Sequence, residues 1–101
     1  GKLVAKLHNN NIIHGDLTTS NMILDHEGIY LIDFGLSFFS HKVEDMAVDI
    51  HLFKQALESK HYKIWENGWK EFLKGYKDCN NYNDVLERFE KVELRGRYKH
   101  K

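Results

Sequence analysis

Apolar residues recur at helical spacing in four stretches of the chain and form two strand-like runs between the first and the second. The opening stretch, "GKLVAKLHNNN", carries one apolar face and predicts a short helix that stops in an asparagine run. Three longer periodic stretches predict helices at about residues 43–60, 62–77 and 83–93. The runs "MIL" and "IYLI", joined by the turn "DHEG", predict a hairpin. The pattern therefore predicts one domain over residues 1–93, mainly α with a small β hairpin.

The predicted helices should bury most of their apolar residues. In the helix at 43–60 the apolar face is wide enough to predict burial on several sides, with these members: Met46, Ala47, Val48, Ile50, Leu52, Phe53, Ala56 and Leu57. The aromatic stripe of the next helix, formed by Trp65, Trp69 and Phe72, is predicted to be core. This arrangement leaves the polar loops to carry any chemistry.

Composition excludes some classes of site and leaves the partner open. Fifteen acidic residues balance fifteen basic ones, so net charge does not indicate a polyanionic partner. Cys79 is the only cysteine, and the seven histidines are scattered, so neither a disulfide framework nor a zinc site is expected. No apolar run approaches membrane-spanning length. The one local excess is basic: residues 94–101 read "LRGRYKHK" and are predicted to form a tail.

The loop and the hairpin carry a recognisable constellation. His14 and Asp16 stand in "HGDLTTSN", Asn21 ends that run, and Asp33 opens the "DFG" triplet after the hairpin. This order and spacing match the catalytic loop (12–21) and the metal motif (33–35) of the protein-kinase fold. Phosphoryl transfer needs charge neutralisation by Mg²⁺, which prefers oxygen ligands, and the side chains of Asn21 and Asp33 offer two. Asp16 would position the acceptor hydroxyl or water and take its proton.

The exact residues of the motifs indicate a particular family within the kinase fold. "HGDLTTSN", "IYLIDFGLS", "EDMAVDI" and "LRGRY" resemble the small atypical serine/threonine kinases of the KEOPS complex, the PRPK or Bud-thirty-two family, which are relatives of the RIO kinases. The resemblance covers residues 13–98. It implies the C-terminal lobe of a kinase-like α+β fold, with Mg²⁺ and ATP as cofactors. It also implies cytoplasmic work (also nuclear in a eukaryote) beside the Kae-type (OSGEP) transferase, which modifies transfer RNA with threonylcarbamoyl-adenosine, and beside the other KEOPS subunits.

The same resemblance implies roles for further positions. Ser20, Ile23 and Ile32 would contact the nucleotide, while His14 and Asp49 would support the loop structurally. Four basic residues of the tail would contact transfer RNA phosphates or the partner subunit: Arg95, Arg97, Lys99 and Lys101. The alternative for that tail is a solvated charge run with no ligand.

Three departures from ordinary protein kinases are visible. Gly15 replaces the arginine that reads a phosphorylated activation loop, and Thr18 replaces a lysine near the transferred phosphate. Only sixteen positions separate Asp33 from Asp49, and no Ala-Pro-Glu motif lies between them. These features favour ATP hydrolysis, or phosphorylation within a complex, over broad phosphorylation of peptides.

The upper half of a nucleotide site is not found in these 101 residues. No Gly-rich loop, strand lysine or helix glutamate precedes the motifs, so we expect the chain to represent the second lobe and to be inactive by itself. Two alternatives remain open at this point. One is another small kinase, such as an aminoglycoside-type phosphotransferase, which usually has His-Pro-Gly where this chain has Thr18-Thr19-Ser20. The other is a non-catalytic adaptor that keeps a kinase-like lobe only to dock the transferase.

Overall fold

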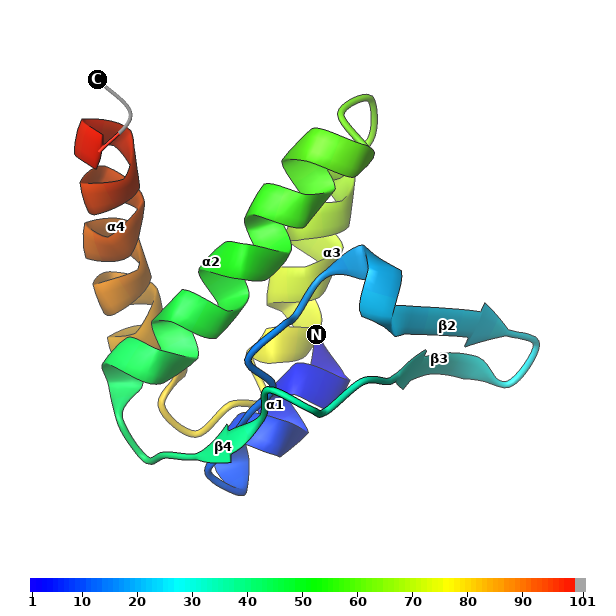
Figure 1. The fold of residues 1–101 in the computed structure, drawn as a ribbon, viewed down its shortest axis with the longest axis horizontal. Coiled ribbons are helices and arrows are strands. Elements are labelled where there is room, and N and C mark those ends of the chain that lie inside the picture. The colour runs from blue at the N-terminus through cyan, green and yellow to red at the C-terminus, as the bar shows by residue number, and fades with distance from the viewer. Residues whose placement is uncertain (100–101) are drawn as a thin grey trace.

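The computed structural model describes the backbone of residues 1–99 and the side chains of residues 1–96. One long helix crosses the middle of the domain, with another helix on one side and the hairpin projecting on the other (Figure 1). The elements are α1 (Lys2–Asn9), β1 (Ile12–Ile13), the 3₁₀ turn η1 (Thr19–Asn21), β2 (Met22–Asp25), β3 (Gly28–Leu31), β4 (Phe38–Phe39), α2 (Val43–Lys60), α3 (Trp65–Tyr76) and α4 (Tyr82–Lys99). The mainly α fold with a small β element is confirmed.

Helix α2 organises the core because it packs against both α3 and α4 and also contacts β1 and η1. Its inward residues are fully or almost fully buried, as the periodicity predicts: Met46, Ala47, Ile50, Phe53, Ala56 and Leu57. The expected burial on several sides is wrong for Val48, which is 44% exposed.

Aromatic side chains join α2 to its neighbours. Phe72 of α3 is buried and stacks between Trp69 and Tyr76, with ring centroids 5.2 and 5.4 Å away. Phe53 of α2 adds a tilted contact with Phe72 at 4.6 Å. Such pairs contribute roughly 0.5–1.5 kcal/mol each beyond the burial of their area. The tryptophan stripe therefore belongs to the packing of the lobe, although Trp65 and Trp69 are only partly buried.

The hairpin forms where the sequence predicts it. β2 and β3 pair antiparallel with Met22 opposite Leu31 and Asp25 opposite Gly28. The Asp25 carboxylate closes the turn, since its Oδ1 accepts the Glu27 and Gly28 amides at 2.8 and 3.2 Å. Gly28 has φ +137°, a conformation that favours glycine.

A second strand pair was not predicted. Ile12 and Ile13, assigned to the loop by sequence, form β1 and pair antiparallel with Phe39 and Phe38 of β4. The Ser40 amide extends this ladder by donating to the Asn11 carbonyl at 2.8 Å. Strands of two residues carry no detectable alternation, so their pairing depends on tertiary contacts alone. The pair ties the chain before the loop to the chain after the "DFG" triplet.

The predicted boundary between a last helix and a tail at residue 94 is wrong, because α4 continues to Lys99. Leucine, arginine and lysine are good helix formers, so the basic run extends the helix. Arg95 also forms an ion pair with Glu44 at the start of α2. The side chains of Arg97 and Lys99, and all of Lys101, lie outside the described residues.

None of the helices in the described part of the chain combines the length and the apolar character that a membrane crossing requires.

Candidate functional site

The candidate catalytic loop, residues 12–21, is held from below by one buried carboxylate. Asp49 of α2 is 2% exposed, and its Oδ2 accepts the His14 amide at 3.0 Å. Its Oδ1 accepts the Gly15 amide at 3.1 Å. These two amides immediately precede Asp16, so Asp49 determines where the backbone presents the candidate base.

Gly15 is required by geometry at this point of the loop. Its φ is +88°, and a Cβ added there would lie 2.2 Å from the carbonyl oxygen of Leu36. Any side chain would collide with that backbone. The absence of an arginine at this position therefore has a structural cause.

His14 joins the loop to the end of the hairpin. The imidazole is fully buried, its Nε2 lies 2.8 Å from the Ile32 carbonyl oxygen, and its Nδ1 lies 3.1 Å from the Asp16 amide. A carbonyl only accepts and an amide only donates, so Nε2 carries the proton and Nδ1 accepts. The Phe34 ring packs on this imidazole at 4.7 Å between centroids. His14 thus aligns Asp16 with the residue before Asp33.

Asn21 is oriented by Asp16. Its Nδ2 donates to the Asp16 carbonyl at 2.8 Å and to the Asp16 carboxylate Oδ2 at 3.0 Å. The amide nitrogen therefore faces Asp16, and the amide oxygen points the other way. That oxygen is the atom suited to a hard cation such as Mg²⁺.

The position of Asp33 is determined by the pairing of the hairpin strands. The Ile32 amide donates to the Asn21 carbonyl at 2.9 Å, so the hairpin ladder continues to the pair Asn21–Ile32. Asp33 leaves the ladder with φ +58°, in the left-handed region, and its side chain is exposed. Non-glycine residues in this conformation are uncommon, and they concentrate at functional sites. The structure brings Asn21 and Asp33 to the same end of the hairpin.

The register also places the positions expected to contact a nucleotide. Residues that alternate along a strand, or pair across it, share a face. Ile23 is two residues after Asn21, and Ile32 pairs with Asn21, so all three lie on one face of the hairpin. Ile23 and Ile32 are 48% and 37% exposed, while Met22 and Leu31 on the opposite face pack against the core. Ser20, in η1, is also exposed.

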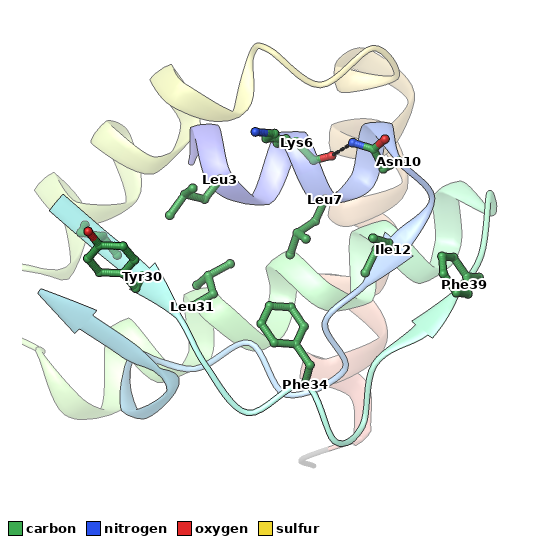
Figure 2. Close-up of a pocket in the computed structure, with 10 residues that line it drawn as sticks. Leu3, Lys6, Leu7, Asn10, Ile12, Tyr30, Leu31, Phe34 and Phe39 are labelled. Atoms are coloured by element: carbon green, nitrogen blue, oxygen red, sulfur yellow. Dashed lines mark hydrogen bonds between the residues drawn. The ribbon is translucent and has the colours of Figure 1, made fainter. Parts of the chain in front are cut away.

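An apolar groove of about 570 Å³ borders this site (Figure 2). Phe34 points into it from beside Asp33, and residues of α1, β1, β3 and β4 complete its walls: Leu3, Leu7, Ile12, Leu31 and Phe39. Phe39 is 82% exposed. The hairpin end therefore presents a hydrophobic surface next to the acidic and amide side chains.

Few side chains around the candidate loop could hold a metal ion. Within the described side chains, no three His, Cys, Asp or Glu residues gather to hold an ion. The oxygens of Asn21 and Asp33 match the preference of Mg²⁺ for hard donors, and this ion usually binds through one or two carboxylates together with substrate phosphates. The donor set therefore fits a cation delivered with a nucleotide.

The tail residues lie away from this constellation. Arg95 sits on α4 and pairs with Glu44, and Arg88 approaches the same carboxylate at 3.8 Å. The structure does not bring Arg95 to the candidate loop, and the other predicted tail residues are outside the described side chains.

Sequence reasoning missed two polar residues beneath the loop. His8 of α1 and Tyr76 of α3 are buried, and His8 Nε2 lies 2.9 Å from Oδ2 of Asp49. Tyr76 Oη lies 2.6 Å from His8 Nδ1. The only local signal is a histidine one helical turn after Val4 on a buried face, which by itself does not indicate a function.

Comparison with known proteins places the chain among kinase-like proteins. Residues 2–50 match the RIO domain family. The chain is 48% identical to the KEOPS complex subunit Bud32 of Pyrococcus abyssi, covering 98% of the chain and 46% of that protein. It is 44% identical to a probable serine/threonine-protein kinase BUD32 homolog of Archaeoglobus fulgidus, covering 97% of the chain and 50% of that protein.

A third relative is longer. The chain is 46% identical to a probable bifunctional tRNA threonylcarbamoyladenosine biosynthesis protein of Methanocaldococcus jannaschii, covering 97% of the chain and 18% of that protein. The chain thus spans about half the length of the first two relatives and a much smaller share of the third.

Proposed function

Because the chain belongs to the Bud32 family of RIO-type atypical kinases, we propose that it forms the metal-binding lobe of an Mg-ATP-dependent kinase or ATPase. The observation that carries this proposal is the arrangement of Asp16, Asn21 and Asp33. Asn21 bonds to Asp16 with its nitrogen, and the hairpin ladder brings its oxygen to the same end as Asp33.

Asn21 and Asp33 would hold Mg²⁺ through the amide oxygen and the carboxylate. When bound, the ion supplies neutralisation of charge on the nucleotide's phosphate oxygens. The left-handed backbone at Asp33 turns its carboxylate out of the strand. The exposed Ile23 and Ile32, on the face that also carries Asn21, offer an apolar surface for the base, and Ser20 offers a hydroxyl.

Asp16 would orient the attacking hydroxyl or water and accept its proton. The Asn21 Nδ2 contact at 3.0 Å restrains rotation of one carboxylate oxygen, Oδ2. The other oxygen is then directed to the acceptor. This division of one carboxylate between an internal donor and a substrate is suited to a positioned general base.

The remaining half of the kinase fold would cover the groove beside Phe34. The relatives are about twice as long as this chain, and the groove exposes a set of apolar side chains next to the site. A first lobe seated there would bury these apolar side chains and extend the fold beside the nucleotide site. We therefore expect the 101 residues expressed alone to show no turnover.

The relatives' names support a role in transfer RNA modification. One is named as a KEOPS complex subunit and another as a bifunctional threonylcarbamoyladenosine biosynthesis protein. We propose that this chain serves a KEOPS complex through a Kae-type transferase subunit, with α4 and the basic residues after Leu94 contacting RNA phosphates or that subunit.

The test is Mg-ATP turnover by the complete gene product, alone and with its transferase and transfer RNA. Asp16→Asn should lower turnover about 10²–10⁴-fold if Asp16 accepts a proton. Asp33→Asn should raise the Mg²⁺ concentration that gives half-maximal turnover. Asp78→Asn, at an exposed aspartate between α3 and α4, is the matched control. Absence of turnover under all conditions, with docking to the transferase intact, would instead establish an adaptor.

Removal of residues 95–101 tests the RNA contact. For every phosphate that these residues neutralise, the truncation should reduce the slope of log affinity against log salt concentration by about one. An unchanged slope would leave these residues without a phosphate role.

A further inference from the structure

A chain of buried polar side chains runs beneath the candidate loop and is not part of the site itself. Tyr76 of α3, His8 of α1 and Asp49 of α2 are 0%, 1% and 2% exposed. The three residues come from three different helices that pack around one point. Tyr76 Oη lies 2.6 Å from His8 Nδ1, and His8 Nε2 lies 2.9 Å from Asp49 Oδ2.

The direction of these hydrogen bonds follows from the partners at the two ends. An ionised carboxylate only accepts, so Nε2 of His8 carries the proton shared with Asp49. Burial raises the pKa of the Tyr76 phenol, with further contributions from the thiol of Cys79 and the negative charge of Asp49. The phenol therefore keeps its proton, and its Oη is close enough to donate that proton to Nδ1. With the phenol as donor to Nδ1, His8 carries its proton on Nε2.

The chain ends at the backbone that carries Asp16. The oxygen of Asp49 that accepts from His8 also accepts the His14 amide, and the other oxygen accepts the Gly15 amide. If His8 stopped donating, one lone pair of Asp49 would lose its partner, and the carboxylate could rotate. Both amides before Asp16 would then lose a fixed acceptor.

We propose that Tyr76 is a positioning residue for the candidate catalytic loop. By donating to His8 it holds this histidine in the Nε2–H form, and His8 in turn fixes the Asp49 carboxylate on which the loop amides rest. The catalytic part of this inference rests on the proposed function, because it assigns to Asp16 the role of base.

Packing of the Tyr76 ring against the His8 ring does not by itself fix the position of the proton on His8. His8 and Tyr76 meet edge to face at 5.5 Å between centroids, with an interplanar angle of 89°. Removal of the hydroxyl should leave this ring packing in place. Tyr76→Phe therefore removes the donor and keeps most of the shape. It leaves Nδ1 buried without its phenol donor, and such an atom carries a desolvation cost.

The first measurement is the protonation of His8 in the complete gene product. Nitrogen-15 NMR of the histidine ring should show Nε2 protonated and Nδ1 unprotonated at neutral pH. A doubly protonated ring, or a proton on Nδ1 only, would overturn the proposal. This readout needs no enzymatic activity and no variant.

The second measurement compares Tyr76→Phe with Tyr82→Phe, which deletes the same hydroxyl from the ring that packs beside Tyr76 at 6.1 Å. Tyr76→Phe should lower kcat about fivefold to thirtyfold, which corresponds to one buried hydrogen bond, and leave KM for ATP within twofold. Tyr82→Phe should change neither. Equal kcat values for the two variants would reject the positioning role.

Amide hydrogen exchange separates this inference from the proposed function. Exchange at His14 and Gly15 should become several-fold faster in Tyr76→Phe and stay unchanged in Tyr82→Phe. If the wild-type protein shows no Asp33-dependent turnover, the proposed function fails, and exchange still decides the positioning. Faster exchange at both amides would support it, and unchanged exchange would overturn it.

Discussion

Replacing Asp49 with asparagine should destabilise the lobe by about 2–4 kcal/mol, and the contacts explain the size of this loss. The carboxylate accepts three donors, from His8, His14 and Gly15, at 2.9, 3.0 and 3.1 Å. An amide has only one acceptor oxygen. In the orientation that keeps more bonds, this oxygen replaces Oδ2 and still accepts two of the donors, while the NH₂ group faces the Gly15 amide.

The cost has three parts. An unsatisfied donor at the partly buried Gly15 costs about 1–3 kcal/mol. The two bonds that remain lose their charge assistance, which is worth about 1 kcal/mol each. Against this, a neutral side chain costs less to bury than a carboxylate, which offsets part of the loss.

Urea unfolding of the complete gene product, followed by circular dichroism, measures this difference. The expected result is a lower midpoint with an unchanged slope, which reports lost stability without a change in the surface exposed. Asp78→Asn changes the same charge at an exposed position and should stay within about 0.5 kcal/mol. A loss below about 1 kcal/mol for Asp49→Asn would refute the claim that this carboxylate anchors the loop.

Three further predictions concern a glycine, a tyrosine and an ion pair. Gly15→Ala should cost about 2 kcal/mol or more in thermal stability because its Cβ would meet the Leu36 carbonyl at 2.2 Å, whereas Gly28→Ala, with nothing within 4 Å, should cost about 1 kcal/mol. Stability should fall above about pH 10, because the raised pKa of Tyr76 means that its phenol ionises more readily in the unfolded chain. The contribution of the Tyr76 phenol to stability is fully present below the pKa that this phenol has in the unfolded chain. Tyr76→Phe should therefore flatten the alkaline limb of a stability–pH curve. Glu44→Gln should strengthen RNA binding about twofold or more and steepen its salt dependence by freeing Arg95, and equal slopes in a titration at several salt concentrations would contradict this.

Local patterns predicted the elements that carry their own periodicity. The hairpin and α2 are confirmed because alternation and a wide apolar face depend only on nearby residues. The family assignment is also confirmed, since it depended on several motifs in a fixed order. The pairing of β1 with β4 could not be predicted, because two-residue strands have no periodic signal and depend on contacts across more than twenty positions.

The basic run at the end of the chain led to a wrong prediction of its secondary structure. The sequence predicts a tail after Leu94, but α4 continues to Lys99. The basic side chains there are good helix formers, and Glu44 supplies Arg95 with a counter-charge from another helix. A counter-charge fifty-one positions away is invisible in a local window.

In the candidate site, too, local spacing identified some residues, whereas others could be recognised only from the folded structure. Asp16, Asn21 and Asp33 were identified by spacing, and their roles stay predictions, although the hairpin brings Asn21 and Asp33 to one end. The residues that orient them came from elsewhere in the chain. His8 and Tyr76 are sixty-eight positions apart, and neither stands in a motif. Their relation exists only after three helices have packed.

These contacts suggest why the loop can dispense with an arginine. In kinases that use one, a phosphate group outside the loop completes its geometry. Here the backbone at Gly15 lies against the Leu36 carbonyl, Asp49 holds both neighbouring amides, and His14 joins the loop to the hairpin. Every one of these restraints is internal to the lobe. A loop built this way is set by folding, so we expect regulation to act through the groove beside Phe34 or through α4, where side chains are still exposed to a partner.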